Sequence, residues 1–291
     1  MIGKEIVSLC HDNAISVNYL TTSKQKIEIS DKYHGYYWNP KKGEIDTNCI
    51  KDVDVIINLV GATVATRWTE AHKKEILSSR VQSAGLLVKT LKENPHQINH
   101  IISASAIGIY QSSLTNYYGE ESHEIDDSYL GNVVSKWEKA IDAFKEIGLE
   151  VCKIRIGLVL SSKGGALLEI AKPIRFGAGA ALGSGNQWQS WIHVDDLAAI
   201  FMYVLKNKIT GVINGVAPNP VTNKEFTRTV ARVLKRPLIL PNLPRLLMKQ
   251  ILGDMHIILF SSQRVSSKKI ENLGYSFQFH HLEPAVADLL K

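Results

Sequence analysis

Small and hydroxyl-bearing residues follow an apolar stretch near the middle of the chain. The segment Ser103 to Tyr110 reads Ser-Ala-Ser-Ala-Ile-Gly-Ile-Tyr and lies at the end of a strand predicted over Ile98 to Ser105. In open α/β folds, ligands bind at the carboxyl ends of the strands. There the Ser105 hydroxyl could hydrogen-bond a carbonyl undergoing reduction, and Tyr110 could line the pocket. A loop that needs small residues in order to turn explains this segment equally well.

A lysine that could support proton transfer lies in the next predicted helix. Asn132 stands four residues before Lys136. A tyrosine in place of Asn132 would share a helical face with this lysine, whose ammonium would then lower the phenol pKa. Tyr129 is seven residues before Lys136, about 10 Å along the axis, so it could face the same cleft but not replace that tyrosine. A solvated helix lysine is an equally good interpretation of Lys136.

Two arginines offer guanidinium groups to a polar ligand. Arg80 lies in a long predicted helix, where it could hold a polar loop, reach a ligand or form a surface ion pair. Arg175 begins a glycine-rich loop that ends at Gln187, and it could clamp a phosphate of a nucleotide-like substrate. The alternative for Arg175 is an exposed residue on a flexible connector.

The first predicted element is an amphipathic helix with no strand before it. Apolar residues repeat at helical spacing over 2–10, and strands are predicted over 15–21 and 53–60. In a dinucleotide-binding βαβ unit, a strand precedes the helix and ends in a glycine-rich turn, whose last glycine packs the helix on the sheet. Gly3 is positioned to be that glycine. We therefore expect a strand of about five apolar residues and two further glycines upstream of Met1, without which the flanking strands have unpaired edges and the cofactor binds weakly.

Strand and helix patterns alternate through the first two thirds of the chain, which predicts an α/β fold with a Rossmann-like, doubly wound parallel sheet. We expect residues 1–160 to form a dinucleotide-binding domain, to which 187–216 return, and 161–291 to form a smaller α/β substrate-binding part. The stretch around Tyr36 to Trp38 shows no regular pattern. The remaining expected elements are strands over Val151–Leu160, Ser190–Val194 and Val212–Val216, helices over Glu70–Lys92 (with Leu77, Val81, Ala84, Val88 and Leu91 buried), from Val133 to Gly148 and over Lys224–Leu234, and helices from Gly164, Asp195 and Leu282.

Composition excludes several classes of protein. With 45% hydrophobic and 21% charged residues, the chain of 291 residues has the balance of a globular protein, and no apolar run or signal-peptide pattern points to a membrane, so we expect a cytoplasmic protein. The net charge of +6 is scattered, which argues against nucleic acid and favours an anionic ligand such as a phosphorylated cofactor. Neither the three cysteines nor the ten histidines form a metal-binding pattern, so we expect no metal.

Spaced motifs along nearly the whole chain resemble the extended short-chain dehydrogenase/reductase superfamily. The resemblance is closest to its atypical nucleotide-sugar-epimerase-like family, whose short C-terminal domain of unknown function is similar to Arg236 to Lys291. The motifs are Asn58 to Ala62, Arg67-Trp68-Thr69, Ser79-Arg80-Val81, Ser103 to Tyr110, Arg155 to Leu160, Gly164 to Leu167 and Trp188 to Ala198.

The resemblance implies an NAD(P)-binding Rossmann domain and an oxidoreductase or epimerase-like enzyme. It would move a hydride to or from a carbonyl or secondary alcohol of a small substrate of a nucleotide- or sugar-like kind. Ser105 would orient the substrate oxygen, Tyr110 or Tyr129 would supply a proton, and Lys136 would contact the ribose. Candidates for cofactor binding are Gly3, Thr22, Lys24, Val60, Gly61, Ala62, Arg80 and Ser103; candidates for substrate binding are Arg175 and Trp191.

Two departures from the superfamily pattern modify these expectations. The second strand ends in Thr22-Ser23-Lys24 without the acidic residue that binds a ribose 2′-hydroxyl, so we expect NADP to be preferred over NAD. The superfamily's Y-x-x-x-K is absent because Asn132 precedes Lys136, which leaves a catalytically weak, cofactor-binding redox sensor or regulator as an alternative. An RNA-binding protein on the same fold is a third hypothesis, disfavoured because the chain lacks a basic stripe with interleaved aromatic residues.

Overall fold

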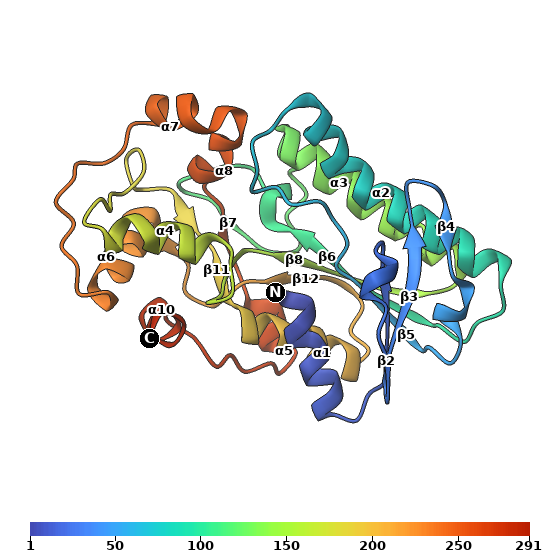
Figure 1. Ribbon diagram of the computed structural model, residues 1–291. Coiled ribbons are helices and arrows are strands. Elements are labelled where there is room, and N and C mark those ends of the chain that lie inside the picture. The colour runs from blue at the N-terminus through green and yellow to red at the C-terminus, as the bar shows by residue number, and fades with distance from the viewer.

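The computed structural model describes residues 1–291, and a parallel sheet lies at its centre. Four strands pair in the order β12-β8-β6-β5, with helices α2 and α3 on one face and α1 and α5 on the other (Figure 1). The chain is thus the α/β protein that the alternating pattern predicts. The elements of this part are α1 (Ile2–Asp12), β5 (Val55–Asn58), α2 (Glu70–Glu93), β6 (His100–Ala106), α3 (Tyr129–Asp142), β8 (Glu150–Ile156), α5 (Val194–Lys206) and β12 (Gly211–Gly215).

A second, smaller sheet is built from the strands that follow α1 in the chain. In it β1 (Val17–Thr21) pairs in parallel with β3 (Tyr33–Asn39), and the short strands β2 (Ile29–Ser30) and β4 (Glu44–Ile45) add to β3. The expectation of an irregular stretch at Tyr36 to Trp38 is therefore wrong. Tyr33, Tyr36 and Tyr37 of β3 are partly buried and Trp38 is buried, so aromatic side chains occupy both faces. This hides the alternation of apolar and polar residues but suits a strand.

An apolar cavity separates the two sheets. Neither β1 nor β5 has a partner on its facing edge, and between them lies a cavity of about 1140 Å³ lined by 29 residues, of which 21 are hydrophobic. The residues that line it include Ile6 and Cys10 of α1 and Leu87 of α2, so helices cover it on both faces. We call this cavity the slot. It lies where the sequence leads us to expect a further strand, and the upstream source of that strand stays a prediction.

Two other expectations need correction. Val81 is exposed on α2 and Leu77 only half-buried, whereas Ile76, Ser83 and Leu87 are buried, because α2 packs on both the sheet and α3. The strand predicted from Val151 to Leu160 is two strands, β8 and β9 (Leu158–Leu160), which belong to different sheets. The break falls at Gly157, where a Cβ atom would lie 2.2 Å from the Ser190 carbonyl oxygen.

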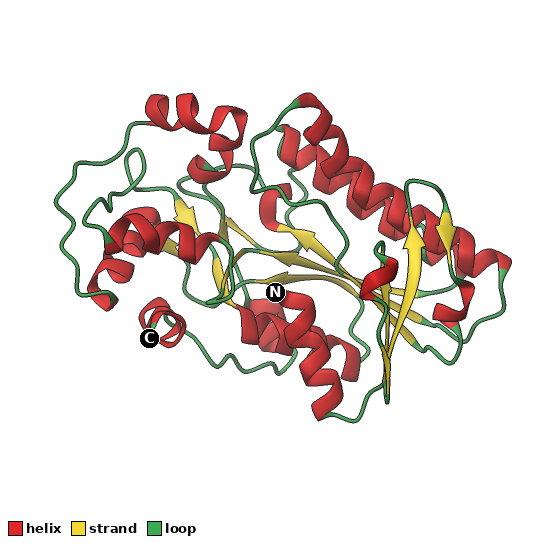
Figure 2. Ribbon diagram, in the orientation of Figure 1, coloured by secondary structure: helices red, strands yellow, loops and turns green.

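The later part of the chain builds a second core beside the main sheet. Helices α4 (Ala166–Arg175), α6 (Asn223–Val233) and α10 (Leu282–Leu290) contribute to a cluster of 15 buried apolar residues. Figure 2 shows these helices beside the central layer of strands. The remaining elements are β7 (Tyr117–Tyr118), β10 (Trp188–Gln189), β11 (Trp191–His193), β13 (Val221–Thr222), α7 (Arg245–Leu252), α8 (His256–Phe260), β14 (Arg264–Val265) and α9 (Lys268–Asn272). No helix has both the length and the hydropathy needed to cross a membrane.

Candidate functional site

A buried polar network lies at the carboxyl ends of β6 and β8. Glu138 of α3 accepts hydrogen bonds from the Ser105 hydroxyl (Oγ to Oε1, 2.6 Å) and from Arg155 (Nε to Oε1, 2.9 Å; Nη2 to Oε2, 3.0 Å). All three side chains are buried. The two bonds from the guanidinium to the carboxylate form a bidentate pair, which is the strong geometry for such groups.

Tyr110 belongs to the same network. Its hydroxyl accepts a hydrogen bond from Arg155 Nη1 (3.0 Å) and donates one to Asn214 Oδ1 (2.7 Å). The Arg155 guanidinium also lies 5.0 Å from the centroid of the Tyr110 ring. The network therefore joins three strands and one helix through the polar atoms of five side chains.

The charges in this network are held in fixed states. Burial alone would raise the pKa of Glu138, but the hydrogen bonds and charge of Arg155, with help from Ser105 and Lys153, hold that pKa below its ordinary value. Burial works against the charged form of Arg155 too, yet Glu138 raises the pKa of the guanidinium. Burial raises the pKa of Tyr110, against the lowering effect of Arg155. Glu138 is thus ionised and Tyr110 neutral near pH 7.

The structure brings two predicted catalytic residues together, but inside this closed network. The hydroxyl protons of Ser105 and Tyr110 are both donated to protein acceptors, and the side chains are 3% and 1% exposed. Sequence reasoning missed Glu138 and Arg155. A signal was present, because Lys153 and Arg155 interrupt an otherwise apolar strand at alternate positions, and a charge placed in that way needs a buried partner.

Tyr129 lies apart from the network, at the first residue of α3. Its hydroxyl donates to the carbonyl oxygen of Lys73 (2.7 Å), and its ring packs edge-on against Trp68. The Lys73 ammonium lies 5.9 Å from the ring centroid. Burial raises the pKa of Tyr129, and the charges of Arg80 and Lys73 oppose that rise. The cations beside this phenol are therefore Lys73 and Arg80, whereas Lys136 is exposed two turns further along the helix.

Arg80 holds the loop that follows β5. This is the first of the three roles that the sequence suggests for it. Its Nη1 donates to the carbonyl oxygens of Ala62 (3.2 Å) and Ile76 (2.7 Å), and its guanidinium lies 4.9 Å from the Trp137 ring. A Cβ atom on Gly61 would lie 2.7 Å from Arg80 Cζ, so any other residue there would push the guanidinium aside. Arg80 thereby shapes the Gly61-Ala62 turn that follows β5.

A second contact orders the same edge of the sheet. Asn58 at the end of β5 donates to Ser103 Oγ on β6 (3.1 Å) and accepts from the backbone N–H of Val60 (3.3 Å). The predicted cofactor residues Val60, Gly61, Ala62, Ser103 and Arg80 thus lie together. Their polar side chains bond to the protein itself. In the turn, the Val60 and Ala62 N–H groups bond to Asn58 and Ser79, and the Gly61 N–H has no hydrogen-bond partner within the protein.

The other predicted cofactor residues lie at the start of α1 and after β1. Gly3 stands in the first turn of α1 and lines the slot, Thr22 is exposed just after β1, and the Lys24 ammonium lies 5.1 Å from the Tyr37 ring. The N–H groups at a helix N-terminus suit a diphosphate, and a lysine without a neighbouring acid suits a ribose 2′-phosphate. This donor set fits a phosphorylated dinucleotide.

The predicted substrate residues are not brought together. Arg175 is exposed at the last residue of α4. Trp191 is 0% exposed in the second core, and its Nε1 donates to the Asn219 carbonyl oxygen (2.9 Å). A substrate could touch this ring only if the second core opened.

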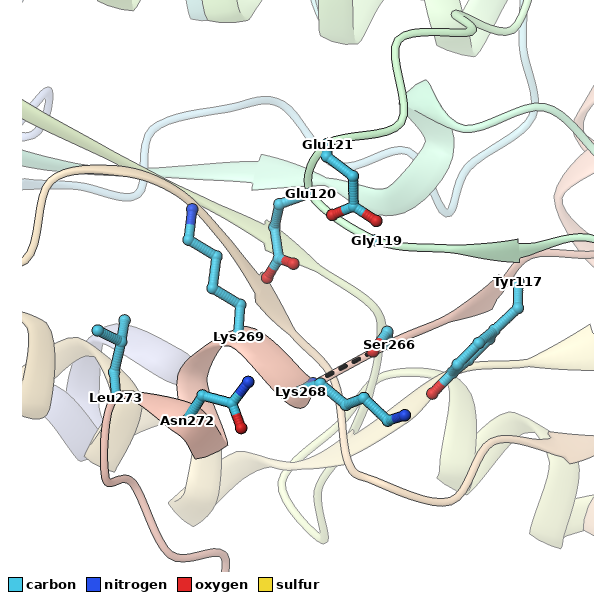
Figure 3. A pocket seen from close by; sticks show the side chains of 9 residues that line it. All are labelled: Tyr117, Gly119, Glu120, Glu121, Ser266, Lys268, Lys269, Asn272 and Leu273. Atoms are coloured by element: carbon cyan, nitrogen blue, oxygen red, sulfur yellow. Dashed lines mark hydrogen bonds between the residues drawn. The ribbon is translucent and has the colours of Figure 1, made fainter.

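A polar pocket of about 480 Å³ lies outside β12, between β7 and α9. Figure 3 shows Glu120 and Glu121 on one side of it and Lys268 and Lys269 on the other. Glu120 accepts a hydrogen bond from the Asn214 N–H (2.8 Å), and Lys269 Nζ donates to the Val212 carbonyl oxygen (2.7 Å). These side chains cover the free edge of β12. No group of three or more His, Cys, Asp or Glu side chains is placed to hold a metal ion.

Two family models match the chain, and both accord with this architecture. The NAD dependent epimerase/dehydratase family matches residues 1–216, and a domain of unknown function (DUF1731) matches residues 243–289. A parallel sheet between two helical layers, with its polar turns at the carboxyl edge, defines a Rossmann-like NAD(P)-binding fold. The chain belongs to the NAD dependent epimerase/dehydratase family.

Individual relatives agree with that assignment. An epimerase family protein of Staphylococcus epidermidis is 35% identical over 292 residues, which cover 100% of this chain and 96% of the relative. The epimerase family protein YfhF of Bacillus subtilis is 35% identical over 269 residues, 92% of this chain and 88% of the relative. Among solved structures, human epimerase family protein SDR39U1 with NADPH is 29% identical with a TM-score of 0.85, covering 99% of this chain and 95% of that chain.

Proposed function

We propose that this protein is an NADP(H)-dependent oxidoreductase of the epimerase-like kind. It acts on a carbonyl or secondary alcohol of a small, nucleotide- or sugar-like substrate. The observation that carries the proposal is the likeness, over 99% of the chain, to the human relative whose structure contains NADPH. The acid-free end of β1, with Thr22 and Lys24, supports NADP over NAD.

The chain's own residues would bind the cofactor and orient the substrate. The N-terminus of α1, beginning with Gly3, would face the diphosphate, and Lys24 the 2′-phosphate. The turn at Gly61, held by Arg80, would supply the Gly61 N–H beside them. When bound, NADPH would supply the hydride.

Tyr129 is the proton donor that the geometry favours. Of the predicted catalytic tyrosines it is the half-buried one, whereas Tyr110 is 1% exposed. The phenol of Tyr129 is protonated near pH 7, as an acid that protonates a carbonyl oxygen must be, and the charges of Arg80 and Lys73 oppose the rise in its pKa that burial causes. Ser105 would then be a positioning residue that acts through Glu138.

Cofactor binding is tested first, by calorimetric titration of NADPH and NADH. We expect tighter binding of NADPH, and Lys24→Glu should reverse the order by placing a carboxylate where the 2′-phosphate would lie. Lys26→Glu is a matched control, because this lysine is exposed in the same short helix. Tighter NADH binding by the wild type would overturn the NADP assignment.

Turnover is tested on a panel of carbonyl substrates. Tyr129→Phe should lower kcat/KM by roughly a hundredfold or more, and Ser105→Ala by roughly ten- to a thousandfold, both with NADPH affinity nearly unchanged. Asn132→Tyr rebuilds Y-x-x-x-K, and a gain in activity would place Lys136 at the ribose. Full activity of both Tyr129→Phe and Ser105→Ala would contradict these roles.

A redox sensor or regulator without turnover is the second candidate. The observation that favours it is the engagement of the predicted catalytic groups with the protein itself, since Ser105 bonds Glu138 and Tyr129 bonds the Lys73 carbonyl. NADPH binding with no turnover on any carbonyl of the panel would decide for the sensor.

A further inference from the structure

The helix α7 is amphipathic, but its apolar side faces outward. It is the one α-helix of the protein without a buried residue, and it packs on the turn and the helix α8 that follow it (Figure 1). Leu246 is 70% exposed, Ile251 58% and Leu247 42%, and their spacing puts them on one side of the helix. An amphipathic helix normally buries its apolar side against another layer. This side of α7 therefore has no partner within the protein.

The loop before α7 exposes further apolar side chains. Ile239 is 75% exposed and Leu240 46%. The backbone of this loop is held in place, because the Leu243 N–H donates to the Ala181 carbonyl oxygen (2.8 Å) and the Leu243 carbonyl accepts from the Gly183 N–H (2.8 Å). Five of the thirteen exposed large hydrophobic side chains of the protein thus fall between residues 239 and 251. We call residues 239–251 the apolar segment.

Positive charge surrounds the apolar segment. Residues 226–253 contain six lysines and arginines and no aspartate or glutamate, so their charge equals the +6 of the whole chain. Of these six cations, Arg232 alone forms an ion pair, with Glu283. The next acid along the chain, Asp254, is paired with Lys73. Cations are scattered over the whole sequence, but here no acids balance them. A partner of this surface should therefore be both apolar and negatively charged.

Charge and residue type distinguish the candidate partners. A second copy of the chain, docked through the same surface by a two-fold axis, would bring like charges together. The apolar anchors of protein interfaces are mostly aromatic, and residues 236–253 contain no aromatic residue. A bilayer with anionic lipids combines acyl chains, which accept leucine and isoleucine, with phosphates that attract lysine and arginine. The composition of this surface fits the bilayer best.

We propose that the apolar segment docks the protein on an anionic lipid bilayer. Leu246, Leu247 and Ile251 enter the boundary between headgroups and acyl chains, while Lys249 on the neighbouring side of α7 reaches the phosphates. The eight residues of α7 span about 12 Å, so the helix lies on the bilayer and does not cross it. This contact goes beyond the proposed function and is independent of it. The surface includes the start of the domain of unknown function at residue 243.

The test is co-sedimentation with large vesicles, either of phosphatidylcholine alone or with about 30% phosphatidylserine. The wild type should bind the mixed vesicles roughly tenfold or more tightly than phosphatidylcholine alone, and added salt should weaken this binding. Combining Leu246→Gln with Ile251→Gln should weaken binding to mixed vesicles roughly tenfold or more, because two aliphatic side chains no longer enter the bilayer. Combining Lys235→Gln with Lys249→Gln should lower both the affinity and its dependence on salt.

A matched control removes an exposed apolar side chain elsewhere. Ile29 of β2 is 79% exposed, close to the value for Ile239, and Ile29→Gln should bind vesicles like the wild type. All the substituted side chains are exposed, so every variant should keep the wild-type Tm, measured by circular dichroism. Their NADPH affinity should also stay unchanged, and failure of the wild type to bind NADPH would count against the proposed function alone.

Three results with vesicles would overturn the proposal. They are no binding of the wild type to either vesicle, equal binding to both, and wild-type affinity in the variant that combines Leu246→Gln with Ile251→Gln. The first would indicate an acidic protein groove as the partner. Sedimentation equilibrium without vesicles tests the second copy. Self-association of the wild type that this variant abolishes would assign the surface to a dimer and would also overturn the proposal.

Discussion

The outer edge of β12 and the inner edges of β1 and β5 are covered in different ways. In a strand paired on one side only, alternate N–H and C=O groups point away from the partner. At β12, Glu120 and Lys269 bond such groups of Asn214 and Val212. At β1 and β5, the edges face the slot, whose lining is mostly hydrophobic. The free polar groups of the β12 edge thus have partners within the protein. The apolar slot lies between two strand edges without partners, so a further strand would fit there.

The largest effect is expected at the buried ion pair of Glu138 and Arg155, between α3 and β8. Glu138→Gln leaves the Arg155 charge without its bidentate partner and should lower the free energy of unfolding by about 3–5 kcal/mol. Chemical denaturation measures this change. Glu146→Gln, at an exposed position of the following turn, should change it by less than about 0.5 kcal/mol. A loss below about 1 kcal/mol for Glu138→Gln would contradict the importance of the pair.

Matched alanine substitutions compare the packing of the main sheet's core with the packing beside the slot. Ile102→Ala removes a side chain that is 0% exposed on β6 and should cost about 2–5 kcal/mol. Ile57→Ala removes a half-buried side chain that lines the slot, so fewer contacts are lost and the cost should be about 1 kcal/mol. Equal losses, measured by denaturation, would show that the slot is packed like the core.

Filling the slot should stabilise the protein. A peptide with about five apolar residues followed by a glycine-rich turn should add between β1 and β5, and at a hundredfold excess over its Kd it should raise the free energy of unfolding by about 2.7 kcal/mol. Hydrogen exchange should slow in Val17–Thr21 and Val55–Asn58 and stay unchanged in β8. A peptide with proline at its centre is the control. Unchanged exchange at both edges would count against a strand in the slot.

The smallest expected effect concerns pH. Because the folded-state pKa of Glu138 lies below its ordinary value near 4.3, the carboxylate contributes stability that is present above that value and is lost as pH falls through the lower, folded pKa. Wild-type Tm should therefore fall on acidification to about pH 3, and Glu138→Gln should show a smaller fall. Parallel curves for the two proteins would show that another carboxylate, such as Asp142, governs the acid response.

Residue patterns predict the helices that bury one face and the strands that are buried on both faces. The helix α1 and the strands β5 and β6 occur close to their predicted positions, because a period of 3.6 or a continuous apolar run directly encodes burial. The strand β3 was missed, since its aromatic side chains serve both faces of its sheet and hide the alternation of apolar and polar residues. The division of the chain at residue 160 stays a prediction.

The candidate site was predictable in part. The small residues of Ser103 to Tyr110 do stand at the carboxyl end of β6, as the strand pattern indicates. The engagement of Ser105 by Glu138 and the pairing of Tyr129 with Lys73 were not predictable, because these partners are 33 and 56 residues apart. Contacts between distant segments depend on how helices lie over the sheet, and no local pattern encodes that.

The sequence by itself determined the alternation of strands and helices, the family resemblance and the lack of an acidic residue after β1, because each depends on residue types at local spacing. Only the tertiary structure decided which polar groups meet. It enclosed Ser105 and Tyr110 with Arg155, and it placed Lys73 and Arg80, rather than Lys136, beside Tyr129. The physical reason is that a buried charge must be matched in three dimensions, where neighbours along the chain are seldom neighbours in space.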